Sequence, residues 1–334
     1  MNPSSSSGMT RRTALAAIGT SAIGIAMGLP RPDDDAEYDS LRKLLPAFTE
    51  DSLKLLQNLR KDPAYAGYIP AADAQVLARN EKLSIDALMV KLLPLAQSYS
   101  HAPISNFYVG VVVRGTTGNL YTGANLEIPG QCLGFTVHAE QAALANAYMH
   151  GDPVQALAVG GAPCGHCRQF INEMSPDGEI LILTPDKPPA KLSTLLPSAF
   201  GPLALGRKAG AFPVAESSFA LLRPTTDELA RAALDAARRS YAPYSKSPSG
   251  VAIRTNAGRI HRGSYIENVA FNPSLSPLQT ALVGLIASGQ TYSAITEVSL
   301  VELDGARITQ SAVTEISLRA IAPKATFNRM LANI

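Results

Sequence analysis

The stretch SYSHAPISNFYVGVVVRGTTGNLYTGANLE, residues 98–127, returns in altered form as SYAPYSKSPSGVAIRTNAGRIHRGSYIE, residues 240–267. Each version runs from Tyr through Ala-Pro and Ser to a Val-containing run, a Gly turn and a second run that ends in Leu-Glu or Ile-Glu. Further on, EQAALANAYMHG parallels LQTALVGLIASG, and each ends in a glycine (Gly151, Gly289), which commonly stops a helix. The repeat predicts two copies of one folding unit.

The first copy alternates strand-like and helix-like runs. Short apolar runs bounded by Gly and polar turns predict strands, and longer runs with apolar residues three and four apart predict helices. Such alternation indicates an α/β sheet with helices packed on its faces. We expect strands at residues 108–114, 119–124, 155–160 and 179–184, and helices at residues 84–99, at 138–150 and from about 164.

The remaining segments differ in composition. MNPSSSSG is polar and of low complexity, and Arg11 and Arg12 precede a short apolar run in the manner of a twin-arginine export signal. That run is weak for a membrane span, so we expect no stable membrane insertion of the mature protein. The expected organisation is a leader and linker at 1–36, a helical element at 37–84, the first copy at 85–190, a Gly/Pro-rich linker at 191–225 and the second copy at 226–334.

Charge and cysteine content narrow the function classes. The 334 residues carry a net charge of only +2 and no long Lys/Arg run, so the electrostatic footprint of a nucleic-acid-binding protein is absent. The three cysteines are too few for a disulfide framework, and all of them lie between residues 132 and 167. Their closeness favours one local site.

Two short motifs contain the candidate metal-binding and catalytic residues. In APCGHCRQF, Pro163 fits the first turn of a helix, and Cys164 and Cys167 stand three apart, so they share one helix face. In TVHAEQ, His138 and Glu140 begin another helix. Two thiolates and one imidazole are typical zinc ligands, and three protein ligands leave the fourth tetrahedral position open to water.

The order His-x-Glu followed by Pro-Cys-x-x-Cys is the signature of zinc deaminases. It predicts one Zn²⁺ per chain on His138, Cys164 and Cys167, with Glu140 as the catalytic acid and base beside the bound water. Two alternatives stay open at this point. Cys164-Gly165-His166-Cys167 is also a pattern of thiol-disulfide oxidoreductases, although that reading leaves Glu140 unexplained. A structural zinc site would need a fourth ligand, which Cys132 or His166 could supply, but we expect Cys132 to be a buried apolar thiol.

With SNFYVG, GANLE, TVHAEQ and PCGHCRQF in this order and spacing, the chain resembles the cytidine deaminase family in its long two-domain form, over about residues 40–334. The resemblance implies a three-layer α/β/α sandwich in two tandem copies and hydrolytic deamination of cytidine and 2′-deoxycytidine to the uridine forms, with release of ammonia. It also implies a homodimer, a small nucleoside substrate and a cytoplasmic location, which the leader-like segment leaves open. The residues that it places at the substrate are Asn125 and Glu127 on the ribose and Phe107 and Ala139 in the nucleoside pocket.

The second copy lacks these groups. Alignment of LQTAL on EQAAL puts Leu278 in the place of Glu140, Ser276 in that of His138, and Tyr265 in that of Asn125. No cysteine follows Cys167, so this copy cannot hold the same zinc site and is expected to be a structural partner. Two other functions remain open: deamination of another amino-pyrimidine or a modified nucleoside, and nucleoside binding without catalysis.

Overall fold

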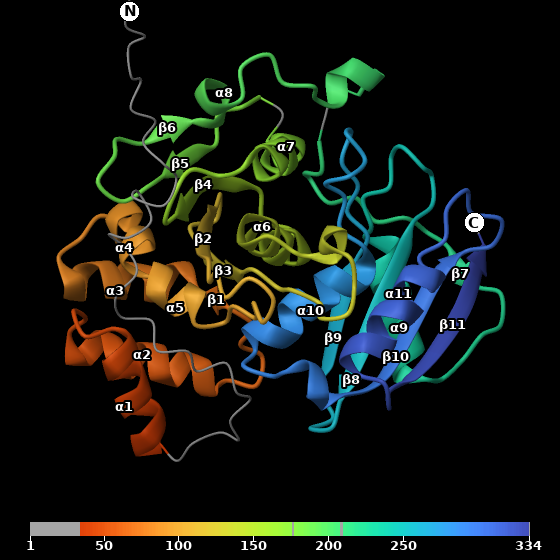
Figure 1. The fold of residues 1–334 in the computed structure, drawn as a ribbon, viewed down its shortest axis with the longest axis horizontal. Coiled ribbons are helices and arrows are strands. Elements are labelled where there is room, and N and C mark those ends of the chain that lie inside the picture. Colours follow the sequence, from red (N-terminus) through yellow and green to blue (C-terminus); the bar gives the residue numbers. More distant parts are fainter. Residues whose placement is uncertain (1–33, 176, 208–209, 334) are drawn as a thin grey trace, which may run out of the picture.

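The computed structural model describes residues 34–175, 177–207 and 210–333. In these residues two mixed β-sheets are each packed against helices (Figure 1). The twin-arginine-like leader falls outside the described residues. The helical element begins slightly earlier than predicted, because α1 (Asp34–Leu44) includes three residues that we assigned to the leader and linker.

The first sheet has the strand order β1-β3-β2-β4-β5-β6. Its strand β4 is antiparallel to β2 and parallel to β5, and its other pairs are antiparallel. Helices α4 and α5 pack on one side of it and α6 on the other, which gives three layers (Figure 1). The strands are β1 (Tyr68–Ile69), β2 (Gly110–Gly115), β3 (Leu120–Ala124), β4 (Val154–Val159), β5 (Leu181–Leu183) and β6 (Ala190–Lys191), and the helices are α4 (Ile85–Lys91), α5 (Leu93–Gln97), α6 (Ala139–His150) and α7 (Gly165–Met174).

The second sheet repeats this topology in the order β7-β11-β10-β8-β9. Strands β9-β8-β10-β11 have the same order and relative directions as β3-β2-β4-β5. The structure therefore confirms two copies of one α/β unit. The elements of this copy are β7 (Ala220–Leu221), α9 (Glu228–Arg238), β8 (Ser249–Thr255), β9 (Ile260–Ser264), α10 (Pro277–Ala287), β10 (Ile295–Leu303), α11 (Ser311–Ile321) and β11 (Thr326–Asn333).

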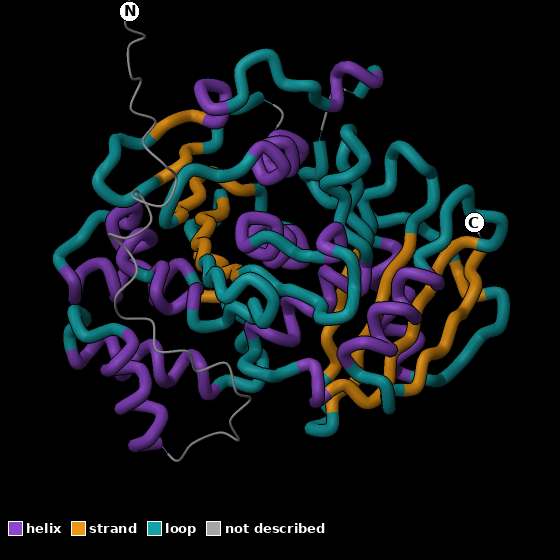
Figure 2. The backbone as a smooth tube through the Cα atoms, viewed as in Figure 1, coloured by secondary structure: helices purple, strands orange, loops and turns teal. Residues whose placement is uncertain are grey.

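The two copies meet through the helix pair α6 and α10, which lies between the two groups of strands (Figure 2). Gln141 of α6 donates from Nε2 to the carbonyl of Pro273 at 2.8 Å, and Gln279 of α10 donates to the carbonyl of Phe135 at 3.1 Å. These two bonds are equivalent under exchange of the copies. One buried hydrophobic cluster includes residues of both copies, so they share a core.

The N-terminal helices are joined to the first sheet. Strand β1 lies between α2 (Glu50–Lys61) and α3 (Ala71–Glu81) in the chain and adds to the edge of β3. The carbonyl of Gly67 accepts from the backbone of Thr122 at 2.8 Å, and the carbonyl of Ala66 accepts from Asn146 of α6 at 2.9 Å. This element therefore braces the sheet and the helix that starts at His138.

Two segments differ from the sequence-based expectation. The helix expected at 84–99 is broken into α4 and α5, because Pro94 has no N–H to continue the hydrogen-bond ladder. The stretch 191–225, which we expected to be a linker, includes short ordered pieces, among them α8 (Leu192–Leu195), the 3₁₀ turn η2 (Pro202–Leu205) and β7 on the edge of the second sheet. In the described part of the chain, no helix has both the length and the apolar character needed to span a membrane.

Helix α6 approaches strand β3 so closely that only glycine fits at position 123. A Cβ there would lie 2.0 Å from the backbone nitrogen of Ala143. We expect Gly123→Ala to lower the free energy of unfolding by about 1–3 kcal/mol, because backbone must move. Gly284→Ala is the control, since its Cβ would find its nearest neighbour at 3.8 Å within helix α10, where Ala is favoured by up to about 1 kcal/mol. Urea unfolding measures both, and equal stabilities would contradict the close-packing account.

Candidate zinc and catalytic site

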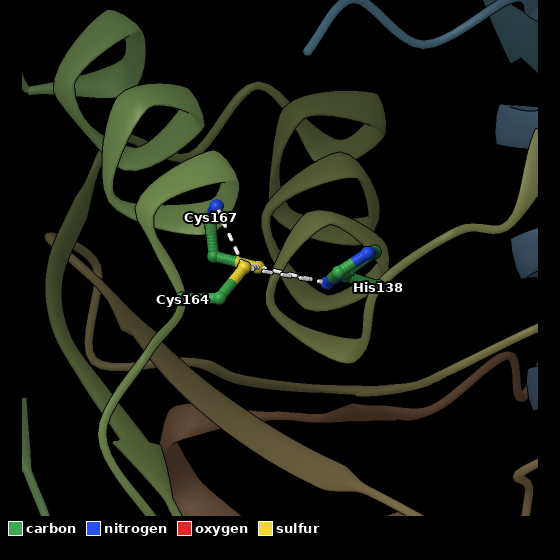
Figure 3. A group of neighbouring side chains, drawn as sticks. All are labelled: His138, Cys164 and Cys167. Atoms are coloured by element: carbon green, nitrogen blue, oxygen red, sulfur yellow. Dashed lines mark hydrogen bonds between the residues drawn. The ribbon is translucent and has the colours of Figure 1, made fainter. Parts of the chain in front are cut away.

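Two helix starts bring the three predicted metal ligands together. His138 is the N-cap of α6, and Cys164 is the N-cap of α7, with Cys167 in the first turn of α7. Helices α6 and α7 pack side by side, so their N-terminal ends present these side chains to one another (Figure 3). Their ligand atoms all lie within 4.8 Å of one another.

The distances between these atoms fit tetrahedral zinc. Nδ1 of His138 lies 3.6 Å from Sγ of Cys164 and 3.3 Å from Sγ of Cys167, and the two sulfurs are 3.5 Å apart. Tetrahedral ligands bound at about 2.0–2.3 Å are separated by about 3.5–3.8 Å. A disulfide would need its sulfurs about 2.05 Å apart, and both cysteines are free thiols here.

The charges around the sulfurs also favour a bound cation. Burial raises the pKa of the Cys167 thiol strongly, and the neighbouring Glu140 and Cys164 raise it further. The buried Cys167 thiolate and Glu140 carboxylate, with the exposed Cys164 thiolate beside them, are unfavourable together when all are deprotonated, and a bound divalent cation would offset this repulsion. Glu140 itself is buried in the first turn of α6, two residues from His138. The donor set therefore fits Zn²⁺ with a carboxylate beside it.

The structure corrects the expectation for Cys132. We expected a buried apolar thiol, but Cys132 is exposed at the start of the 3₁₀ turn η1 (Leu133–Phe135), and it is not in the His138 cluster. The exposed position follows from the loop 130–134, which lies on the surface between β3 and α6. The ring of His166 stacks on that of His138 with centroids 5.2 Å apart, and His166 is not in the cluster either.

Asn125 and Glu127 follow β3 and are both buried. Oδ1 of Asn125 accepts from the hydroxyl of Ser100 at 2.5 Å and from the amide of Val109 at 2.9 Å, and its Nδ2 donates to the carbonyl of Phe107 at 2.8 Å. One amide hydrogen of Asn125 is left over by these bonds. The side chain thus fixes the segment that carries Phe107 and keeps one donor for another partner.

Glu127 is held in one orientation by residues 104 and 105. One carboxylate oxygen accepts from the backbone of Ile104 at 2.7 Å and of Ser105 at 3.1 Å, and the other accepts from the Ser105 hydroxyl. Burial acts to raise the pKa of Glu127, but these hydrogen bonds outweigh it and lower the pKa below its ordinary value. Glu127 is therefore a preoriented carboxylate that stays ionised at neutral pH.

The other two predicted pocket residues differ in exposure. Ala139 is buried at the first position of α6, between His138 and Glu140. Phe107 is 55% exposed in the single chain. Its ring therefore stands at an open rim rather than inside an enclosed pocket.

Comparison with known proteins follows the same two-copy division. Two models described as the cytidine and deoxycytidylate deaminase zinc-binding region match residues 83–183 and 192–315. Cytidine deaminase of Vibrio vulnificus is 44% identical over 248 residues, which cover 74% of this chain and 83% of that protein. Cytidine deaminase of Cronobacter sakazakii is 43% identical over 267 residues, covering 80% and 90%. The chain belongs to the cytidine deaminase family. Among solved structures, the cytidine deaminase of Mycobacterium tuberculosis is 32% identical with a TM-score of 0.32, and the match covers 34% of this chain and 96% of that chain.

Within this cytidine deaminase fold, the backbone fixes how the two copies correspond. Leu126 bridges His101 and Val137, and Ile266 bridges Tyr241 and Leu275 in the same way. This register places Tyr265 on Asn125, Ser276 on His138 and Leu278 on Glu140, as the sequence alignment predicts.

The second copy keeps the carboxylate, but the position that corresponds to Phe107 is bonded to another segment of the chain. Glu267 accepts from the backbone of Tyr244 at 2.7 Å, as Glu127 does from Ile104. Ser247 stands where Phe107 is in the first copy, and its hydroxyl accepts from the amides of residues 307 and 308 at 3.0 and 3.3 Å. Residues 307 and 308 therefore lie against the position that corresponds to Phe107.

Sequence reasoning missed several residues that hold this deaminase site together. Arg168 follows Cys167 directly in the chain. Its guanidinium donates to the carbonyls of Pro163 at 2.8 Å and Leu195 at 2.6 Å, so it fixes the loop before Cys164. Oε1 of Gln141 accepts from the backbone of His138 at 3.1 Å. The Gln of HAEQ was the one available signal, since Gln three residues after an N-cap is typical of a capping box.

Proposed function

We propose that the protein catalyses the hydrolytic deamination of cytidine and 2′-deoxycytidine to uridine and 2′-deoxyuridine, with release of ammonia. The observation that carries the proposal is the convergence of His138, Cys164 and Cys167 at two helix starts, with Glu140 buried in the first turn of α6, two residues from His138. Three ligands leave a coordination position for water, and a purely structural site would close it. When bound, zinc supplies a water whose pKa is lowered toward neutrality.

The catalytic role falls to Glu140. Its carboxylate takes a proton from the attacking water and delivers it to N3 of cytosine, while the water oxygen bonds to C4. Glu140 then moves the second proton to the departing amine, the C4–N bond breaks, and the 4-oxo product forms. Water and cytidine thus give uridine and ammonia, and Glu140 ends as it began.

The proposed sugar contacts are Asn125 and Glu127. The spare amide hydrogen of Asn125 and the fixed carboxylate of Glu127 suit ribose hydroxyls, which are both donors and acceptors. A buried pair of this kind favours a free nucleoside over a polynucleotide. Phe107 is proposed to cover the nucleoside.

A substrate panel tests this function. The zinc-loaded full chain is incubated with cytidine, 2′-deoxycytidine, free cytosine and other amino-pyrimidine nucleosides, and ammonia release is measured. We expect turnover of the first two and little of cytosine, which lacks the sugar. Faster turnover of another nucleoside would support the alternative deaminase, and binding of cytidine without ammonia would favour a non-catalytic nucleoside-binding protein.

We also propose that the protein is a homodimer. Ile104 and Phe107, whose backbones bond to Glu127 and Asn125, have exposed apolar side chains, and Leu133 of η1 and Leu203 of η2 are exposed as well. Large exposed apolar side chains that form a contiguous patch typically mark an interface, and we propose that these do. A second copy of this chain is the occupant that would also enclose the open rim at Phe107.

Sedimentation checks the dimer directly. From the 35.2 kDa chain we expect a species of about 70 kDa. Leu133→Glu should shift it toward the monomer, whereas Leu222→Glu, which replaces an exposed leucine beside β7 in the second sheet, should not. A monomeric wild type would contradict the proposal.

A further inference from the structure

One segment of the inert copy contacts both helices that carry the metal-binding residues. This segment, residues 268–273, is here termed the clamp loop. On α6, Gln141 donates to the carbonyl of Pro273 at 2.8 Å. On α7, the carbonyl of Gln169 accepts from Nδ2 of Asn268 at 3.0 Å. The same Gln141 also accepts from the backbone of His138, so the clamp loop is one residue removed from a metal ligand.

The strongest of these contacts is made by Glu173 in the last turn of α7. Glu173 is fully buried, and the three groups in the described residues that donate to its carboxylate belong to the second copy. Its Oε1 accepts from the hydroxyls of Tyr241 and Tyr244 at 2.6 Å each, and its Oε2 accepts from the backbone of Val269 in the clamp loop at 2.8 Å. A buried carboxylate costs stability unless it is hydrogen-bonded, and short bonds of this charge-assisted kind are strong.

The two tyrosines remain donors over the physiological range. Burial raises the pKa of both hydroxyls, and the hydrogen bonds to Glu173 raise the pKa values further. The guanidinium of Arg207 lies over the ring of Tyr241, 5.6 Å from its centroid. Its positive charge lowers the pKa of Tyr241, but burial and Glu173 outweigh this effect. The cluster thus holds the C-terminal part of α7 against the second copy.

Anchoring one end of α7 fixes the other. Glu173 is six residues, about 9 Å along the axis, from Cys167. Because an α-helix this short moves as a unit, the bonds at Glu173 and Gln169 set the direction in which the first turn presents Cys164 and Cys167. The bond at Gln141 does the same for His138 on α6.

We infer that the clamp loop, together with Tyr241 and Tyr244, is a positioning element of the zinc site. None of these residues is a proposed contact of metal or substrate; they hold α6 and α7 at the spacing that brings three ligands to one ion. The inert copy therefore contributes to metal retention and not only to overall stability. The inference rests on the proposed assignment of His138, Cys164 and Cys167 as zinc ligands.

The test compares two buried glutamates of like chemistry. Glu302 in β10 of the second sheet is also buried. It accepts from the hydroxyl of Thr309, the amide of Gln310 and Nε of Arg329, and none of these three partners belongs to α6 or α7. Glu173→Gln places an amide NH₂ against the Val269 N–H or the tyrosine hydroxyls. Glu302→Gln places one against donors unrelated to the zinc site.

The measurement is the rate at which zinc-loaded full-length protein loses zinc to excess chelator, followed beside urea unfolding. We expect Glu173→Gln to lose zinc about tenfold or more faster than wild type, in the range seen when partners of metal ligands are removed. Its kcat should fall with zinc content while KM changes little. Glu302→Gln should lose comparable stability but release zinc at the wild-type rate.

Tyr244→Phe is the milder variant if Glu173→Gln folds poorly, since it removes one donor of three, and it should give an intermediate rate of zinc loss. Wild-type zinc loss in both α7-cluster variants, or equally fast loss in Glu302→Gln, would overturn the inference while leaving the proposed function intact. A wild type that holds no zinc would overturn the proposed function and the inference together.

Discussion

Glu140→Gln is expected to keep about one zinc per chain and to lose cytidine turnover by about 10²–10⁴-fold. Gln has the same length and fits the same buried place in the first turn of α6, so the ligand cluster is preserved. Its amide cannot take a proton from water or hand one to N3 of cytosine. Ammonia release and zinc content, measured on the same preparation, separate the two effects.

Glu179→Gln provides the matched control for that experiment. Glu179 is an exposed residue paired with Lys191 on the surface, so the same chemical change there should alter neither zinc nor turnover. Near-normal turnover in Glu140→Gln would refute the acid–base role, and loss of zinc in that variant would show that the carboxylate also supports the metal.

Cys164→Ala should abolish zinc binding and activity together, leaving less than about a hundredth of the wild-type turnover, because two remaining ligands hold the ion weakly. The loss of the sulfur also removes the cap that accepts from the backbone of Cys167 at 3.4 Å, so a small loss of stability is expected. Zinc content by metal analysis and ammonia release are the measurements.

Cys132→Ala is the control for Cys164→Ala, since Cys132 is an exposed free thiol outside the ligand cluster. It should retain both zinc and turnover. A metal-free Cys164→Ala protein that still deaminates cytidine would contradict the zinc mechanism, and zinc loss in Cys132→Ala would make that residue a fourth ligand.

The repeat and the two motifs were sufficient to predict the two-copy α/β fold and the three residues that converge on one point. They were sufficient because His138, Cys164 and Cys167 each lie at the start of a helix. At a helix start, the spacing of residues along the chain determines which way their side chains point. Pro94 could have shown the break between α4 and α5, because a proline inside a helical pattern removes one hydrogen bond. The exposure of Cys132 was missed although Pro129-Gly130 marks a turn just before it, and such connecting segments lie on the surface.

The contacts between the two copies could not be predicted from the sequence. Glu173 looks like an ordinary helical glutamate, and its donors at Tyr241, Tyr244 and Val269 are about 70 to 100 residues away in the chain. His101 received no role, yet its ring packs edge-on against Tyr292 of the 3₁₀ turn η3 (Tyr292–Ala294), at 4.6 Å between centroids. Such long-range pairs depend on how two copies dock, and no local pattern records that.

The paired bonds from Gln141 and Gln279 have a consequence for dilute solution. Partners on separate polypeptides come apart when their concentration falls below the dissociation constant, but here a covalent tether keeps the supporting half at a fixed, high effective concentration. The two copies of one chain therefore stay docked at any protein concentration. The second copy can therefore support the zinc-binding half without a separate association step.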